Sequence, residues 1–185
     1  KADDPRFFVE LKSLLAEENS ISAIERLEGL GLFPFLWPDL KPHLKIDRRF
    51  HHALTQAQRA ISWFKLLYLS ESFEPWIVYL FAIMGRSPVT VLINFCNRFQ
   101  IGPKQKEFMV HEKSSADKTA HFLSRRTNLK NSELYTVLNE LHNEGLLYLM
   151  AIARNNEIKR AVSHYFTSMI HEATLLNGTD LKEMG

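Results

Sequence analysis

The sequence contains little glycine, a single cysteine and no apolar run long enough to cross a membrane. Only 7 of its 185 residues are glycine, and strand alternation with hairpin turns is absent, so the composition favours helix over sheet. The one cysteine, Cys96, excludes a disulfide framework, and we expect a buried, unreactive thiol in a reducing, cytoplasmic setting. The longest apolar stretch, PWIVYLFAIMG at 75–85, is about half a membrane span. It predicts a buried helix and no membrane partner.

Familiar catalytic motifs are absent as well. The sequence has no GxxxxGK[ST] phosphate loop, no GxGxxG nucleotide fingerprint and no GxSxG nucleophile turn. Its histidines are scattered, and the stretches HEKSS at 111–115 and HEATL at 171–175 lack the second histidine of a zinc protease. The first residues, KADDPRFF, are charged and unlike a secretion signal. We therefore predict no catalytic, cofactor-binding or metal-binding residue in this chain.

The sequence does contain helical periodicity, which continues almost without interruption. The apolar spacing predicts helices over residues 4–18, 20–31, 47–70, 75–85, 88–100, 103–126, 131–144 and 146–176. The clearest internal boundary is Gly102-Pro103, since neither residue favours continuation of a helix. The predicted fold class is all-α, a multi-helix array of helical hairpins, with a helical body over 1–100 and a helical tail over 101–185.

Charge is distributed unevenly along the chain. The net charge of +2 combines +3 over residues 46–100 and +4 over residues 101–130 with negative values towards both ends. A basic middle can mark a surface that binds a polyanion. It is also common on solvated helices, where residues spaced like Lys113 and Asp117 form intrahelical pairs. Charge alone leaves both interpretations open.

Three stretches share their order and spacing with one known family. The first, at 4–41, carries the matching positions Arg6, Glu10, Leu11, Leu27, Gly31, Leu32 and Pro38. The second is LYTVLNELHNEGLLYLMA at 134–151, and the third is LNGTDLKEMG at 176–185, with matches at Gly178, Asp180, Leu181 and Gly185. Together they resemble the part of class II tRNA nucleotidyltransferases and bacterial poly(A) polymerases that follows the nucleotide-binding neck. In that family, a turn similar to the third stretch leads into a Pro-Gly-Pro loop.

The resemblance implies the RNA-binding C-terminal body and tail of a bacterial tRNA nucleotidyltransferase that holds tRNA for 3′-end nucleotide addition. The tail looks closest to the long A-adding type, which often carries upstream CBS and DHH domains. The family's catalytic head is not among these residues, and the chain stops just before the Pro-Gly-Pro loop, so we expect this chain to be inactive alone. The implied partners are tRNA and that head. Mg²⁺ and ATP or CTP would serve the full-length enzyme, whose choice between A-, CC- or CCA-addition and poly(A) synthesis depends on the head and neck.

Given this resemblance, the basic residues become candidates for RNA contact. In the segment after Gly102, Lys106 and Lys113 are seven residues apart, and so are Lys118 and Arg125. Each pair should therefore lie on the same side of one helix, two turns apart. The full set of predicted RNA-binding residues is Arg48, Arg49, Lys106, Lys113, Lys118, Arg125, Arg126, Lys130, Gly178, Asp180 and Lys182.

Two other function classes stay open. The stretch NSELYTVLNELHNEGLLYL at 131–149 also resembles the reading head of a winged-helix DNA-binding regulator. Such a head needs a β-hairpin wing, and the following residues are rich in Ala, Met and Leu instead. A helical scaffold that binds protein partners is the second alternative, and it predicts an exposed apolar groove.

Overall fold

The computed structural model describes residues 5–17, 19–40, 47–69, 72–85, 87–126, 129–153 and 155–171. These residues form α-helices and two short 3₁₀ helices, and no strand occurs among them. The elements are α1 Pro5–Ala16, α2 Ser20–Gly29, α3 Phe33–Leu36, η1 Pro38–Leu40, α4 Arg48–Lys65, α5 Pro75–Met84, α6 Val89–Arg98, α7 Pro103–Arg125, α8 Asn131–Leu138, α9 Asn143–Ile152, α10 Asn156–Thr167 and η2 Met169–His171. The predicted all-α fold class is confirmed.

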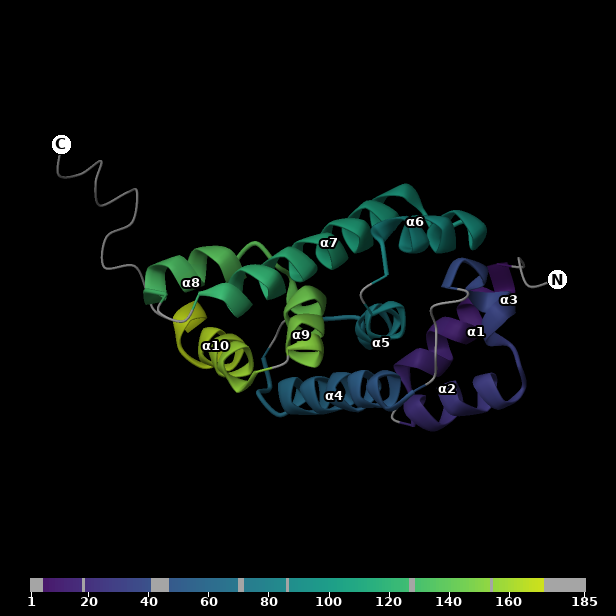
Figure 1. Ribbon diagram of the computed structural model, residues 1–185, viewed down its shortest axis with the longest axis horizontal. Helices are drawn as coiled ribbons and strands as arrows, with labels where there is room; N and C mark the ends of the chain where they lie inside the picture. The colour runs from purple at the N-terminus through teal and green to yellow at the C-terminus, as the bar shows by residue number, and fades with distance from the viewer. Residues whose placement is uncertain are drawn as a thin grey trace.

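The helices form an elongated array around a central helix (Figure 1). α5 is seen end-on in the middle, with α4 along one long edge of the molecule and α7 along the other. α9 lies between those two long helices and contacts both, as well as α5. α1, α2 and α3 occupy one end, and α8 and α10 the other.

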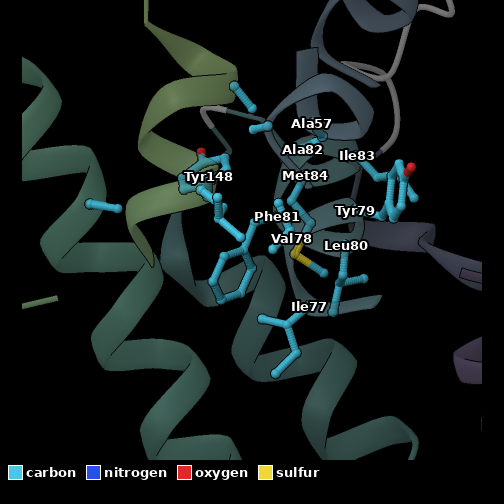
Figure 2. Packing of buried hydrophobic residues seen from close by; sticks show 14 of the residues in the cluster. Ala57, Ile77, Val78, Tyr79, Leu80, Phe81, Ala82, Ile83, Met84 and Tyr148 are labelled. Atoms are coloured by element: carbon cyan, nitrogen blue, oxygen red, sulfur yellow. The ribbon is translucent and has the colours of Figure 1, made fainter. Parts of the chain in front are cut away.

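α5 is central because every side of it is apolar. Pro75 lies in its first turn, where a missing N–H costs no hydrogen bond. All residues from Trp76 to Met84 are buried, as expected for a helix that is hydrophobic all round. Gly85, with φ +52°, ends the helix. Figure 2 shows these side chains pointing in several directions, with Phe81 near Tyr148 of α9. The predicted buried helix is confirmed.

α4 has one apolar side, which packs against α5 and α9. Its N-cap is Asp47, whose carboxylate accepts hydrogen bonds from Arg49 N at 2.9 Å and Phe50 N at 3.0 Å. These bonds lower the pKa of Asp47. The helix ends at Lys65, so the predicted extension to residue 70 is wrong. A turn with Tyr68 at φ +50°, outside the right-handed helical region, follows instead.

The hydrophobic core is continuous from the first helices to η2 and includes residues on both sides of position 100. α9, from the predicted tail, packs against α4 and α5 of the predicted body. The division into body and tail stays a prediction, but any such parts share this core. Within the described ranges, no helix is long and apolar enough to cross a membrane.

Candidate nucleic-acid interface

The predicted long helix after Gly102 is confirmed as α7, which has one buried side and one exposed side. Pro103 lies in its first turn, and the helix continues for 23 residues. Its buried positions include the apolar Met109, Ala116 and Leu123, and they also include two charged residues, Glu112 and Lys113. The interpretation of these charged residues as part of a solvated helix therefore missed the buried polar face that Glu112 and Lys113 form.

Glu112 is completely buried and points at the start of α9. Its Oε2 accepts a hydrogen bond from His142 N at 2.9 Å, and its Oε1 lies 2.8 Å from His142 Nδ1. His111 Nδ1 lies 3.4 Å from the same Oε1. His142 is the N-cap of α9, so an anion sits at a helix N-terminus, where the backbone dipole favours negative charge. Gly145 makes this approach possible, because a Cβ there would overlap with Glu112 Oε2.

Lys113 is buried too, with 1% of its surface exposed. Its Nζ donates to Gly85 O at 2.6 Å and to Asp117 Oδ2 at 2.7 Å. It also lies 5.1 Å from the ring centroid of Tyr148, whose hydroxyl donates to Gly85 O. Burial lowers the pKa of Lys113, against the opposing effect of Asp117. The prediction that Lys113 contacts RNA is incompatible with this position, since the ammonium group is inside the protein and fully engaged.

The exposed side of α7 carries a row of cationic and titratable side chains. With 3.6 residues per turn, a spacing of seven returns to nearly the same side of the helix. Lys104, His111, Lys118 and Arg125 follow this spacing, and all four are exposed. We call these four residues the α7 stripe. Its ends are about 32 Å apart at a rise of 1.5 Å per residue. Within the described part of the chain, no salt bridge engages Lys104, Lys118 or Arg125.

The other predicted basic residues take different positions. Arg126 and Lys130 are exposed beyond the end of α7 and lengthen the basic surface, with the Arg126 guanidinium 4.9 Å from the Phe122 ring centroid. Lys106 turns towards α6 and donates to Asn97 Oδ1 at 2.6 Å, so it is not on the stripe.

Arg48 and Arg49 are exposed at the start of α4, which lies along the opposite long edge from α7 (Figure 1). The structure therefore does not bring this pair together with the α7 stripe. Gly178, Asp180 and Lys182 lie outside the described residues.

Sequence reasoning missed Lys104 and His111 as members of this surface. The signal was present in the spacing, because 104, 111, 118 and 125 form one heptad series, whereas 106 and 113 form another. The sequence alone did not show which of the two series faces the interior.

The structure bears on the two alternative functions, a winged-helix DNA-binding regulator and a helical scaffold that binds protein partners. Within the described residues that follow the 131–149 stretch, the last turn of α9 and then α10 take the place of a β-hairpin, so the wing that the DNA-binding interpretation requires is not formed there. The scaffold interpretation predicts an exposed apolar groove. The exposed large apolar side chains in the described ranges come from several helices and turns: Val9, Leu30, Phe35, Leu66, Tyr68 and Tyr135.

No group of three or more His, Cys, Asp or Glu residues in the described ranges is arranged to hold a metal ion. Cys96, the single thiol, is fully buried, and burial raises its pKa to about 11. The prediction of a buried cysteine is confirmed.

Comparison with known proteins identifies a relative along nearly the entire chain. No family model matches the sequence. It is 33% identical over 184 residues to the A-adding tRNA nucleotidyltransferase of Geobacter sulfurreducens, and the match covers 97% of this chain and 20% of that protein. The chain thus spans about a fifth of the length of the curated relative that it matches.

Solved structures share the fold. The Thermotoga maritima CCA-adding enzyme in complex with tRNA matches with a TM-score of 0.72 and 18% identity, over 98% of this chain and 42% of that chain. A CCA-adding enzyme in complex with CTP matches with a TM-score of 0.71 and 18% identity, over 98% and 41% respectively. The curated relative confirms the resemblance to tRNA nucleotidyltransferases expected from the sequence, and the solved structures confirm the helical architecture.

Proposed function

We propose that this chain is a tRNA-holding part of a tRNA nucleotidyltransferase and that the α7 stripe is its main contact with RNA. The observation that carries the proposal is the stripe itself, a row of exposed cationic and imidazole side chains along one helix. The structural neighbour solved with tRNA supports the choice of RNA as the polyanion.

The stripe suits a duplex RNA better than a specific base sequence. Side chains cannot reach into the deep, narrow major groove of an A-form helix, so proteins recognise such helices by shape and by phosphate and 2′-hydroxyl contacts. Lysine and arginine heads in a row about 32 Å long can contact phosphates at successive points along one strand. Arg126 and Lys130 extend this row, and the exposed His111 adds positive charge when protonated.

The proposal assigns nucleotide addition, with Mg²⁺ and ATP or CTP, to a catalytic head elsewhere in the full-length enzyme. The role of this chain is to position the RNA so that its 3′ end reaches that head, which lowers the entropic barrier to reaction. Purified residues 1–185 are then expected to incorporate no labelled ATP into tRNA.

The test is a salt series of binding to tRNA and to an acceptor-stem minihelix. Affinity of the wild-type chain is expected to fall linearly with salt on logarithmic axes. The variant Lys118→Glu/Arg125→Glu should bind at least about tenfold more weakly and reduce the magnitude of the salt slope by about 2, since two phosphate contacts are lost. Far-UV circular dichroism should be unchanged, because both side chains are exposed.

The matched control is Arg26→Glu/Lys65→Glu, which changes net charge equally at exposed positions on α2 and near the end of α4. It should retain the wild-type salt slope. Equal losses in both double variants would show that only net charge matters and would refute the stripe. Absence of RNA binding by the wild-type chain at low salt would refute the proposed function.

A further inference from the structure

A cavity of about 540 Å³ lies at the turn between α8 and α9, against α10. Its volume is within the range of small-molecule and nucleoside sites. Its lining residues include the apolar Leu146 and Phe166 and the polar Ser72, Asn139 and Tyr165. A lining of mixed polar and apolar side chains suits a ligand that has both an apolar part and a hydrogen-bonding edge.

The acidic group of this cavity is Glu144, in the first turn of α9. It lines the cavity although only 7% of its surface is exposed. Its Oε1 accepts a hydrogen bond from Glu74 N at 2.8 Å, which fixes the carboxyl group. Burial raises the pKa of Glu144. A fixed carboxylate repels phosphate and accepts hydrogen bonds, so it selects a neutral ligand edge that presents N–H donors.

The cavity adjoins the α7 stripe. His142 lines it, and Oε1 of Glu112 lies 2.8 Å from His142 Nδ1 and 3.4 Å from Nδ1 of the stripe residue His111. The His142 ring also stacks edge-on against Phe108 of α7, with centroids 5.1 Å apart. The cavity therefore lies beside His111, within reach of an RNA strand whose phosphates follow the stripe.

We propose that this cavity receives one unstacked base of the bound RNA and that the Glu144 carboxylate reads its N–H donors. Guanine fits best among the four bases, because its Watson–Crick edge offers two adjacent donors, N1–H and the 2-amino group, to the two oxygens of one carboxylate. Proteins commonly read RNA through unstacked bases that are hydrogen-bonded along their edges. The inference rests on the proposed function and adds base selectivity to a surface that otherwise reads only phosphates.

The experiment compares single-stranded RNA hexamers for binding to residues 1–185: all-uridine, and uridine with one guanosine or one inosine. Inosine lacks only the 2-amino group. The guanosine hexamer should bind about tenfold more tightly than the all-uridine hexamer, and inosine should lose most of that gain. Glu144→Gln should abolish the preference while still accepting the bond from Glu74 N.

Two further variants sharpen the test. Glu157→Gln removes the same charge at an exposed position of α10 and should keep the guanosine preference. Ser72→Trp places a large ring at the exposed rim of the cavity and should remove the preference without removing binding.

Equal binding of all three hexamers by the wild-type chain, with normal sensitivity to Lys118→Glu/Arg125→Glu, would overturn the cavity proposal and leave the proposed function intact. A guanosine preference that survives Glu144→Gln would also overturn it. Failure of the wild-type chain to bind any hexamer or tRNA at low salt would overturn both.

Discussion

Replacing Gly145 by alanine should destabilise the fold by about 2 kcal/mol. A Cβ at this position would overlap with Glu112 Oε2 and lie 3.1 Å from Leu141 Cδ2. A flexible exposed glutamate could move away, but Glu112 is fully buried and holds His142 N. Overpacking costs about 1–3 kcal/mol, and a lost hydrogen bond to a charged group costs about 1.5–3 kcal/mol. If Glu112 shifts only part of the way, neither cost applies in full and the two together amount to about 3 kcal/mol. The higher helix propensity of alanine offsets about 1 kcal/mol of this destabilisation.

The assay is urea unfolding followed by circular dichroism at 25 °C. With a slope of about 1–3 kcal/mol per M urea, the midpoint of Gly145→Ala should fall by about 1 M. The matched control is Gly29→Ala at the end of α2, where a new Cβ meets no atom within 4 Å. That variant should be neutral or more stable by up to about 1 kcal/mol.

A double-mutant cycle identifies the cause of the loss. In a Glu112→Ala background, the alanine at 145 has room, so its additional cost should largely disappear and the coupling energy should be about 2 kcal/mol. The reasoning is refuted if Gly145→Ala behaves like Gly29→Ala, or if its cost is unchanged when Glu112 is absent.

Three other predictions follow from buried groups. Lys113→Met should lower the free energy of unfolding by about 2 kcal/mol because Gly85 O loses a charged donor, whereas the exposed Lys104→Met should change it by less than about 0.5 kcal/mol in the same urea assay. Since burial raises the pKa of Glu144, the folded chain holds this proton more tightly than the unfolded chain. The free energy of unfolding should therefore fall as pH rises from the ordinary glutamate pKa through the raised one. Glu144→Gln should remove this fall when the free energy of unfolding is measured as a function of pH. An unchanged fall in the variant would contradict the assignment to Glu144. Cys96, fully buried with a pKa of about 11, should react with a thiol reagent only after denaturation, and rapid reaction of the native chain would contradict its burial.

The sequence predicted the existence of the main helices because their apolar spacing reflects burial directly. α5 is the clearest case: an uninterrupted apolar run flanked by Pro75 and Gly85 is long for a strand and is typical of a helix surrounded by other elements. The end of α4 was predicted less well. Leu66, Leu67 and Leu69 continue the apolar pattern past Lys65, although the backbone has already left the helix there.

The candidate site was predicted only in part, because the sequence does not show how a helix is rotated about its axis. The spacing of Lys113 and Asp117 correctly indicated an ion pair, which forms at 2.7 Å. The same spacing is compatible with a solvated pair and with a buried one. The difference depends on Gly85 O and the Tyr148 ring, which belong to elements distant in sequence. Lys118 and Arg125, assigned by the same rule, do lie on the exposed side.

The buried charges of α7 explain why its basic stripe faces outward. Glu112 and Lys113 are neighbours in sequence, yet the anion engages the N-terminal end of α9 and the cation engages the carbonyl of Gly85 at the C-terminal end of α5. Each charge meets the helix end whose dipole it complements. Rotating α7 by one residue, about 100°, would break both sets of bonds and leave charges buried without partners, which costs several kcal/mol. The outward direction of Lys104, Lys118 and Arg125 is thus fixed by side chains that never reach the surface, and a variant that loosens Glu112 or Lys113 should weaken RNA binding without removing a single surface charge.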